Sequence, residues 1–448
     1  MVLSKGIKMN KKRRMWGAAI IGMLCVGSGI YAWIDSRASL KAGKTEKTVA
    51  YKGLNDVITN EMSASGDLER MDYDIDMFMR KWEIRGLSLA VVRHDSLLYA
   101  KSYGYFDADR QVPLKPGHIM RIASVSKLIT GAAVMKLVEQ GKIRLDSPVF
   151  GPRGILNDKE YTDAIKDTAY YSITVEDLLR HEGGFTNAGG DPMFNTPTMM
   201  LRFKLEEAPD SKTLVKNIIT RRLRYRPGSM RYYSNFGYML LSLVVEKASG
   251  QDYETYAIEN LLRPAGCYGF HIAGTYKEER RPEESYYYMA SDAEPVPEYN
   301  NSGRMVPRCY GGNNIRGLQG AGGWAASAVE LARLVASIDG DPRVKDVLSA
   351  QSVKTMTGVR GKDSFGIGWH RVSERGEWVR SGSLSCTGAL IQHFGDGECW
   401  VLVTNTGSWI GPRLPRQIAA MFNRFRQRYS AKLPRQDLFL KMPDNNQH

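Results

Sequence analysis

The chain has 448 residues, of which 43% are hydrophobic and 25% charged, a composition typical of a folded protein and not of a disordered one. The formal net charge is +14, and six cations without any acid stand in the first fourteen residues, which leaves 14 − 6 = +8 spread along the rest. There is no zinc-finger spacing and no arginine-rich arm beside aromatic platforms, so we expect no nucleic-acid partner.

Residues 15–34 form an uncharged apolar run, MWGAAIIGMLCVGSGIYAWI, directly after those cations. About twenty such residues span a bilayer, whereas the apolar core of a cleaved signal peptide has about 7–15. The run predicts a transmembrane signal-anchor after a cytoplasmic segment, 1–14, with the rest of the chain on the periplasmic side of a bacterial inner membrane. The small residues at 36–38 also fit a cleavage site, so export after signal cleavage is the alternative.

The cysteines do not indicate a metal or redox motif. One of the five, Cys25, lies in the predicted anchor, and the others, which form no C-x-x-C pair, are Cys267, Cys309, Cys386 and Cys399. In an exported domain these four could form two disulfides, and buried free thiols are the equal alternative.

Two predicted elements come before the most informative motif. Residues 35–66 are polar and poor in aromatic residues, which is typical of a linker. Met71, Ile75, Phe78 and Trp82 then share one face of a predicted helix. Residues 86–104 form two β-rich runs divided at 94–96, which predicts a hairpin.

The stretch RIASVSKLIT places Ser124 and Lys127 at the head of an apolar helix predicted to end at Gly141. Residues three apart on a helix share a face. A serine hydroxyl becomes a good nucleophile when a neighbouring base takes its proton, and burial makes a lysine such a base. By itself this spacing also fits an N-cap serine followed by a surface lysine.

Two later segments support the catalytic interpretation. Tyr233 and Asn235 stand in a predicted loop before another apolar helix, which ends at Gly250, and a phenol near a lysine can relay a proton. Residues 364–405 read as consecutive antiparallel strands, and Arg380, Ser381 and Gly382 begin one of them.

Ser-x-x-Lys, Tyr-x-Asn and a cation followed by Ser-Gly, in this order, resemble the serine β-lactamase and penicillin-binding protein superfamily. The resemblance is strongest to the class C branch with its D,D-carboxypeptidase and esterase relatives. Three further stretches are similar to that branch: GKIRLDSPV from residue 141, ITVEDLLRHEGGF from 173 and GAGGWAASAVELARLV from 320. The resemblance covers roughly residues 70–428.

This resemblance implies roles for individual residues. Ser124 would be the nucleophile, Lys127 its base or base partner, Tyr233 a proton relay and Asn235 a residue that orients the substrate. The backbone N–H groups of Ser124 and Ser383 would form the oxyanion hole. Which of Lys127 and Tyr233 takes the first proton stays open, and no metal or organic cofactor is implied.

The third motif departs from the family pattern. Arg380 stands where the family usually has lysine or histidine, and Ser381 replaces threonine before Gly382. A guanidinium could bind a substrate carboxylate but cannot transfer a proton, which puts penicillin hydrolysis in doubt. An alternative frame, CTG at 386–388, keeps Thr-Gly without the cation. We prefer the Arg380 frame because SGSL directly follows the strand residues 377–379.

Three other features have less specific interpretations. His181, a tempting triad base, matches a structural histidine of the family. Residues 278–301 mix charges, aromatic residues and prolines, which predicts a long surface loop that either borders the pocket or is a solvated insertion. The basic helix that begins near residue 416 is expected to pack with its cations extended into solvent.

We therefore expect an α/β fold of the β-lactamase/transpeptidase type over 67–430, with a central antiparallel sheet flanked by helices and a mainly helical subdomain, followed by a tail, 431–448. The expected function is that of a serine hydrolase that forms a covalent acyl-enzyme on an amide or ester, such as a cell-wall-type D-amino-acid peptide or a related small substrate. The alternatives are a carboxylesterase of the same fold and a catalytically silent penicillin-binding or sensor module. A Ser/Lys protease of the signal-peptidase kind would not require Tyr233 and Asn235.

Overall fold

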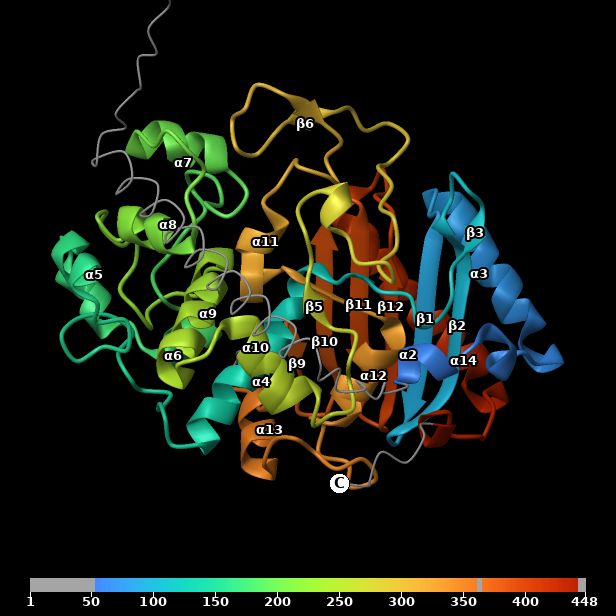
Figure 1. Ribbon diagram of the computed structural model, residues 1–448. Helices are drawn as coiled ribbons and strands as arrows, with labels where there is room; N and C mark the ends of the chain where they lie inside the picture. Colours follow the sequence, from blue (N-terminus) through green and yellow to red (C-terminus); the bar gives the residue numbers. More distant parts are fainter. Residues whose placement is uncertain (1–52, 361–364, 442–448) are drawn as a thin grey trace, which may run out of the picture. The chain divides into compact units, whose positions relative to one another are not determined.

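The computed structural model describes residues 53–360 and 365–441 (Figure 1). The expected cytoplasmic segment, the predicted anchor at 15–34 and most of the expected linker lie outside these residues. Within the described ranges, no helix is long and apolar enough to cross a membrane.

A seven-stranded antiparallel sheet forms the centre of the fold, with strand order β3-β2-β1-β12-β11-β10-β9. The predicted hairpin is β1 and β2, and β1 pairs on its other side with β12 near the end of the chain. The first and last parts of the sequence therefore complete one sheet. The strands are β1 (Gly86–Arg93), β2 (Ser96–Asp107), β3 (Val112–Pro113), β9 (Arg371–Val372), β10 (Trp378–Leu384), β11 (Thr387–His393) and β12 (Glu398–Thr404).

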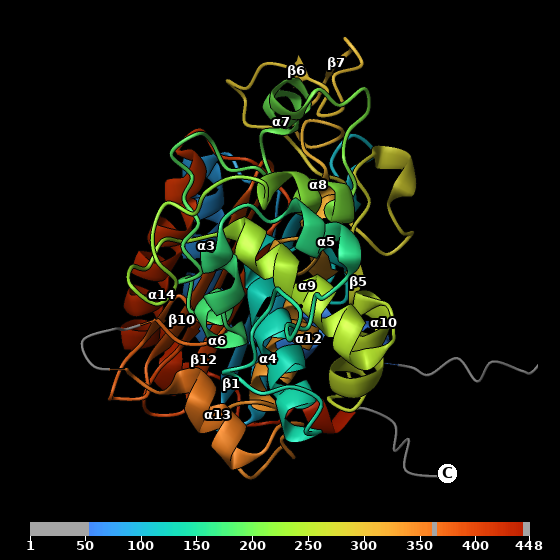
Figure 2. The same ribbon diagram turned by 90° about the vertical axis from the view of Figure 1, so that its left-hand side faces the viewer.

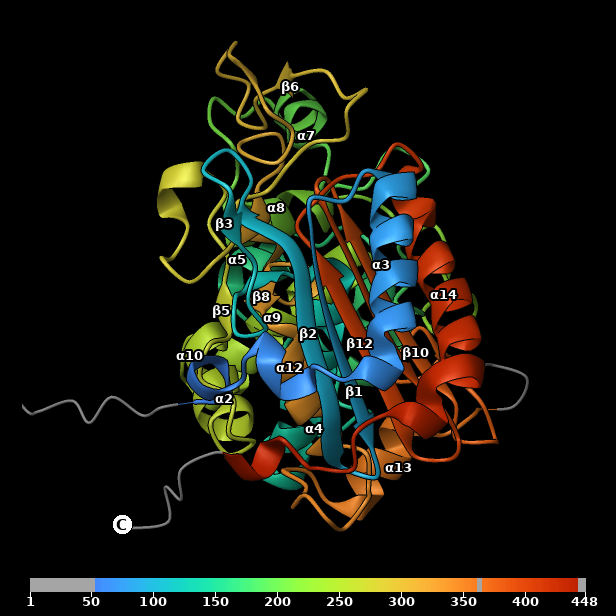
Figure 3. The same ribbon diagram turned by 90° about the vertical axis from the view of Figure 1, so that its right-hand side faces the viewer.

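Side chains alternate between two hydrophobic cores along these strands. In β12, Trp400 and Leu402 pack into a core shared with helices α3 (Glu69–Trp82) and α14 (Leu414–Tyr429), while Val401 and Val403 pack into the larger core on the opposite face. Figure 3 shows α3 and α14 side by side across one face of the sheet. The predicted helix at 71–82 and the basic C-terminal helix thus cover the same face.

Most other helices lie on the opposite side of the sheet, where α4 and α9 cross the interior (Figure 2). Nearly every residue of α4 is buried, which explains why its sequence is apolar on all faces. The remaining helices are α2 (Leu54–Val57), α4 (Ser126–Glu139), α5 (Lys159–Ala164), α6 (Val175–Leu179), α7 (Thr196–Phe203), α8 (Ser211–Ile218), α9 (Asn235–Ser249), α10 (Tyr253–Ala257), α11 (Ile315–Leu318), α12 (Ala328–Ala336) and α13 (Ala350–Thr357).

Two small sheets complete the described fold. One has the order β4-β8-β5, with β4 at Met120–Arg121, β8 at Trp324–Ala326 and β5 at His271–Ile272. Its strand β4 leads into the turn that contains Ser124. The other is the hairpin of β6 (Val296–Pro297) and β7 (Met305–Val306), which lies in and after the segment predicted as a surface loop. That segment is not wholly at the surface, because Glu284 and Tyr287 are buried.

The structure differs from the expectation at three element boundaries. The helix expected to begin at Ser124 is preceded by a short 3-10 turn, Ala123–Val125, and α4 begins at Ser126. In the expected linker, α2 packs Leu54 fully into the main core. In the expected tail, Phe439 is also buried in that core. These apolar residues are spaced too widely to show a helical or strand period, so the sequence pattern did not indicate their burial.

Candidate active site

Ser124 lies in the tight turn between strand β4 and helix α4. The preceding residue, Ala123, has a φ angle of +50°, a left-handed conformation that is strained for a residue with a side chain. The turn is anchored where the backbone N–H of Ile122 donates to the carbonyl of Trp324 at 3.0 Å. This turn presents the Ser124 side chain at the amino-terminal end of α4, where the helix dipole favours negative charge.

Lys127 lies one turn further along the chain and is fully buried. Its Nζ donates to the Ser124 Oγ at 3.2 Å, to the Asn235 Oδ1 at 2.7 Å and to the Ala321 carbonyl at 2.5 Å. Burial lowers the pKa of Lys127 to about 8; the nearby Tyr233 opposes this change and the Arg380 charge adds to it. The neutral amine, which can accept a proton, is therefore accessible near neutral pH.

Tyr233 contacts Ser124 from the other direction. Its hydroxyl donates to the Ser124 Oγ at 2.8 Å, and the Nη2 of Arg380 donates to the phenol oxygen at 3.1 Å. Burial by itself raises the pKa of Tyr233, but the charges of Lys127 and Arg380 outweigh it and bring that pKa down to about 8. Ser124 thus has two neighbouring groups that lose a proton far more readily than they would in water.

Asn235, the first residue of α9, is held on both sides of its amide. Its Oδ1 accepts from Lys127, as above, and its Nδ2 donates to the Asp191 carboxylate at 2.6 Å. Asp191 was not identified from the sequence, because it lies in the irregular segment before α7 and matches no motif. The one sequence signal for such a carboxylate is the predicted burial of Lys127 near Asn235, because a buried charge is usually paired with an opposite one.

Arg380 reaches the site, but its side chain is only 1% exposed. Its Nε donates to the Ser124 carbonyl at 2.6 Å, in addition to the contact between its Nη2 and Tyr233. The guanidinium therefore acts as a fixed charge behind the serine and the phenol.

Gly382 brings strand β10 directly against the Ser124 turn. A Cβ atom at residue 382 would lie 2.3 Å from the Ile122 carbonyl oxygen and 3.1 Å from the Ser124 nitrogen, so this position requires glycine. The next residue, Ser383, is therefore close to the turn as well.

The backbone of β10 directs the Ser383 N–H toward the free edge of the strand. β9 pairs with β10 only at Trp378 and Val379, and the Val379 carbonyl faces β9, where it accepts from His370 at 2.9 Å. Residues two apart in a strand direct their N–H groups to the same side. The Ser383 N–H therefore faces away from β11, beyond the end of β9, as an oxyanion donor must.

The remaining residues of the third motif are clearly placed. The Oγ of Ser381 lies 3.3 Å from the Nδ1 of His370, a histidine that stands outside the three sequence motifs. In the alternative frame, the Thr387 hydroxyl is buried and donates to the carbonyls of Arg121 and Thr404. The Thr387 hydroxyl is thus engaged by these two carbonyls, whereas Arg380 donates directly to the Ser124 carbonyl and to the Tyr233 hydroxyl.

His181 is buried behind Tyr233 and does not contact Ser124. Its Nδ1 accepts from the backbone N–H of Ser234 at 3.2 Å, and its ring packs 4.5 Å from that of Tyr233. Burial, together with the charges of Lys127 and Arg380, keeps the pKa of His181 well below its usual value. A neutral ring in this place supports the tyrosine loop, which is a structural role.

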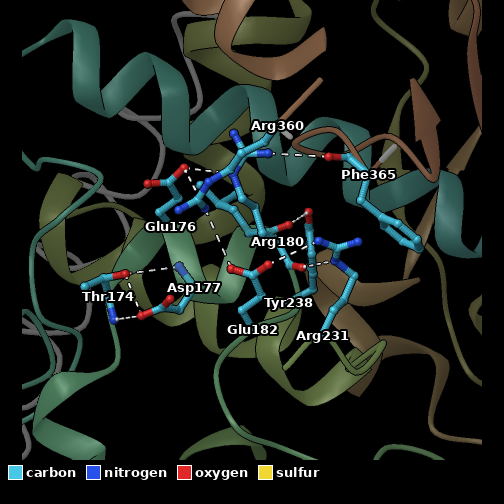
Figure 4. Close-up of polar contacts among 10 residues, drawn as sticks. Thr174, Glu176, Asp177, Arg180, Glu182, Arg231, Tyr238, Arg360 and Phe365 are labelled. Atoms are coloured by element: carbon cyan, nitrogen blue, oxygen red, sulfur yellow. Dashed lines mark hydrogen bonds and ion pairs between the residues drawn. The ribbon is translucent and has the colours of Figure 1, made fainter. Parts of the chain in front are cut away.

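An ion-pair network joins Glu176, Arg180 and Glu182 to Arg231 and Arg360, as Figure 4 shows. Arg180 pairs with Glu176 at 2.8 Å, Arg231 pairs with Glu182 at 3.1 Å, and Arg360 lies within 3.7 Å of both acids. Because Arg231 stands two residues before Tyr233, the network fixes one end of the loop that carries the phenol.

A cavity of about 510 Å³ adjoins the site at Ser383. Its lining includes Arg308 and two groups of neighbours in the chain, Met289, Ala290, Asp292 and Ala293, and Thr406, Gly407, Ser408, Trp409, Gly411 and Pro412. The expected surface loop thus borders this cavity in its second half. The four cysteines of the described ranges are buried free thiols.

Comparison with known proteins agrees with this architecture. The curated protein Flp of Staphylococcus aureus (strain N315) is 26% identical over 240 residues, which are 52% of this chain and 44% of Flp, so the chain spans less than half of that relative. The esterase EstB of Burkholderia gladioli is 27% identical over 69% of this chain and 79% of its own.

Solved structures share the fold. A D-amino acid amidase from Ochrobactrum anthropi superposes with a TM-score of 0.62 at 18% identity, over 82% of this chain and 99% of its own. The octameric penicillin-binding protein homologue from Pyrococcus abyssi superposes with a TM-score of 0.57 at 22% identity, over 83% of this chain and 79% of its own. The beta-lactamase family model matches residues 74–440. The chain therefore belongs to the beta-lactamase family.

Proposed function

We propose that this protein is a serine hydrolase of the Ser-x-x-Lys and Tyr-x-Asn type that forms a covalent acyl-enzyme on an amide or ester. The observation that carries the proposal is the position of the Ser124 Oγ, 2.8 Å from the Tyr233 hydroxyl and 3.2 Å from the Lys127 Nζ. Both neighbours have a pKa of about 8. A nucleophile and its base within hydrogen-bond reach are the signature of covalent catalysis.

The chemistry follows from these positions. Deprotonated Tyr233 or Lys127 takes the Ser124 hydroxyl proton while the Oγ attacks the substrate carbonyl carbon. The N–H groups of Ser124 and Ser383 stabilise the oxyanion that forms, and removing one such donor typically costs about 3 kcal/mol of barrier. The same base returns the proton to the leaving amine or alkoxide, which leaves an acyl ester on Ser124. Water then hydrolyses this ester by the reverse sequence of proton transfers.

The substrate class we favour is a cell-wall-type D-amino-acid peptide or a related small D-amino-acid derivative. The fold shared with a D-amino acid amidase and with a penicillin-binding protein homologue supports this choice. In this scheme Asn235 orients the substrate amide, Ser381 and Gly382 flank it along β10, and Arg380 promotes ionisation of Tyr233. The buried position of Arg380 supports this electrostatic role better than a direct grip on a substrate carboxylate.

A carboxylesterase is the second candidate, which the similarity to EstB supports. A silent penicillin-binding module would have the same fold without turnover. We also propose that residues 15–34 anchor the protein in the bacterial inner membrane with the catalytic domain on the periplasmic side, because six cations precede this apolar run.

Mass spectrometry of the intact protein tests the proposal. The full-length protein, purified in a non-ionic detergent, would be exposed to a fluorophosphonate and separately to a panel of β-lactams, with Ser124→Ala as control. We expect one adduct on Ser124 and none in the variant. Labelling by β-lactams would favour a wall-peptide substrate over an ester. A folded wild-type protein that forms no adduct would refute the hydrolase proposal and leave the silent module.

A further inference from the structure

A second cavity, of about 390 Å³, lies beside the tyrosine loop and is lined by four arginines, Arg202, Arg221, Arg222 and Arg224. We call it the arginine cavity. The Arg202 guanidinium lies over Gly189 on its wall, since a Cβ at residue 189 would be 3.2 Å from the Arg202 Nη2. Arg221 and Tyr170 line the same cavity.

Among the residues that the structure describes, no carboxylate neutralises these arginines. In the described part of the chain, none of the four takes part in an ion pair. Arg180, Arg231 and Arg360, in the neighbouring network of Figure 4, all pair with Glu176 or Glu182. The same small region therefore contains arginines that pair with acids and, among the described residues, arginines that line a cavity without an ion pair.

The charge of the chain is concentrated here. Residues 196–231 contain nine Lys or Arg and three Asp or Glu, 9 − 3 = +6, whereas the whole chain after residue 14 carries +8. From the composition, the excess of positive charge after residue 14 was expected to be spread along the chain. Most of it belongs instead to the segment around this cavity. Such a concentration produces a local potential that attracts anions.

The cavity is next to the catalytic machinery. Ser234 and Asn187 line it. The Asn187 Nδ2 donates to the Tyr233 carbonyl at 3.4 Å, and the hydroxyl of the same tyrosine contacts the Ser124 Oγ. One residue, Tyr233, therefore connects the wall of the cavity to the nucleophile candidate.

We propose that the arginine cavity binds an anionic oxyacid group, a phosphate or a carboxylate, carried by the substrate that Ser124 acylates. Guanidinium groups match both anions in bidentate geometry. That the anion belongs to a substrate rests on the proposed function. The binding of the anion itself does not depend on that function. A substrate with a negative group on the side of Tyr233 would be held at two points, which favours it over a neutral analogue of equal size.

Equilibrium binding tests the cavity without any need for catalysis. Isothermal titration of the full-length protein at low ionic strength would use inorganic phosphate, pyrophosphate and glutarate as probes. We expect at least one to bind, and to bind about tenfold more weakly to the Arg202→Gln/Arg221→Gln variant. The matched control, Arg263→Gln/Arg424→Gln, loses the same charge at two exposed arginines outside the arginine cavity, and it should bind like the wild type. The preferred probe identifies the group as phosphate or carboxylate.

A pair of chromogenic esters tests the connection to catalysis. For p-nitrophenyl glutarate, which is anionic, the cavity variant should raise KM about tenfold with kcat unchanged. For neutral p-nitrophenyl butyrate it should change neither constant. Added salt should weaken the binding of the anionic ester and leave that of the neutral ester unchanged, because salt screens the exposed charges.

Each outcome decides one of the two proposals. Equal probe binding by the cavity variant, the control and the wild type, or no probe binding to the wild type, would overturn the cavity inference. Turnover of both esters with an unchanged KM ratio in the variant would also overturn it, while leaving the hydrolase intact. No turnover of either ester and no label on Ser124, with probe binding lost in the variant, would instead refute the hydrolase and support the anion site.

Discussion

The Asp191 carboxylate lies 2.6 Å from the amide nitrogen of Asn235, and the amide oxygen of the same asparagine lies 2.7 Å from the Lys127 Nζ. This arrangement sets the orientation of the Asn235 amide, since the nitrogen must face the carboxylate and the oxygen must face the lysine. The negative charge of Asp191 also raises the pKa of Lys127, against the stronger effect of burial. Asp191 thus positions Asn235 of the Tyr-x-Asn motif and, through it, Lys127 of the Ser-x-x-Lys motif.

Asp191→Asn should lower kcat/KM by about tenfold, which corresponds to about 1.4 kcal/mol of barrier. Without the carboxylate, the pKa of Lys127 falls further, so the rise of activity with pH should move to lower pH. A pH–rate profile checks both effects, with the exposed Asp109→Asn as the matched control. A uniform loss of activity without a shift of the profile would mean that Asp191 has only a structural role.

The acylation rate should increase as pH rises through about 8. The reason is that Lys127 and Tyr233 both have a pKa of about 8, and only their deprotonated forms accept a proton. Tyr233→Phe should reduce the rate by about 10²–10⁴-fold. Absorbance of the phenolate near 295 nm gives an independent measurement: one tyrosine should ionise near pH 8 in the wild type and none in the variant. A spectrum without that transition would contradict the assigned acidity of Tyr233.

Arg380→Gln should raise the pKa of both Tyr233 and Lys127, because the Arg380 charge lowers both. The pH profile should therefore move to higher pH, and activity at pH 7 should fall by about tenfold or more. Arg380→Lys, which keeps a positive charge without the fork geometry, should lie between this variant and the wild type. If Arg380→Gln changes KM alone, Arg380 acts on the substrate and not on the phenol.

Gly382→Ala should disrupt the contact between β10 and the Ser124 turn. Its Cβ would meet backbone atoms of Ile122 and Ser124, which cannot move aside like a flexible side chain. Overpacking of this kind typically costs about 1–3 kcal/mol of unfolding free energy, and displacement of β10 would weaken the oxyanion hole. Urea unfolding and fluorophosphonate labelling measure these two effects. Gly66→Ala is the control, because nothing lies within 4 Å of its Cβ.

A pair of carboxyl groups far from the site should make stability depend on pH. The turn residue Asp95 is buried with its Oδ1 unpaired, and its Oδ2 accepts from the Val344 N–H. Burial and the charge of Asp341 raise the pKa of Asp95 to about 6, and burial and the charge of Asp95 raise that of Asp339 to about 8. The folded state therefore binds more protons than the unfolded state from about pH 4 upward, so unfolding free energy falls as pH rises from about 4 to about 8.

Asp339→Asn should remove most of this dependence. The amide keeps an oxygen for the Asp341 N–H, which now donates to Asp339 at 2.9 Å, and it carries no charge. We expect the variant to be more stable than the wild type by about 1–2 kcal/mol at pH 8 and equal to it near pH 4. Urea unfolding at both pH values gives the comparison. If the variant is more stable than the wild type at pH 4 and not at pH 8, the predicted direction of the pH dependence is wrong.

Local sequence determined much of the fold and the list of site candidates. The period of Met71, Ile75, Phe78 and Trp82 was enough to predict α3, and the β-rich runs on either side of residues 94–96 were enough to predict the β1–β2 hairpin, because both depend on neighbours in the chain. The order of Ser124-x-x-Lys127, Tyr233-x-Asn235 and Arg380 identified the nucleophile candidate and its surroundings, since these motifs have fixed spacing.

Tertiary structure decided what depends on residues far apart in sequence. The pKa values of Lys127 and Tyr233 follow from burial and from the approach of Arg380, a residue 147 positions after Tyr233. Asp191 has no motif of its own and becomes part of the site only because its loop folds over Asn235. In the same way, the net charge of +6 on residues 196–231 looks like ordinary surface charge when only the sequence is considered. It becomes a candidate anion site only where the fold places four arginines, which form no ion pair within the described ranges, around one cavity beside Tyr233. The reason is that electrostatic interactions depend on distance and exposure in space and not on order in the chain.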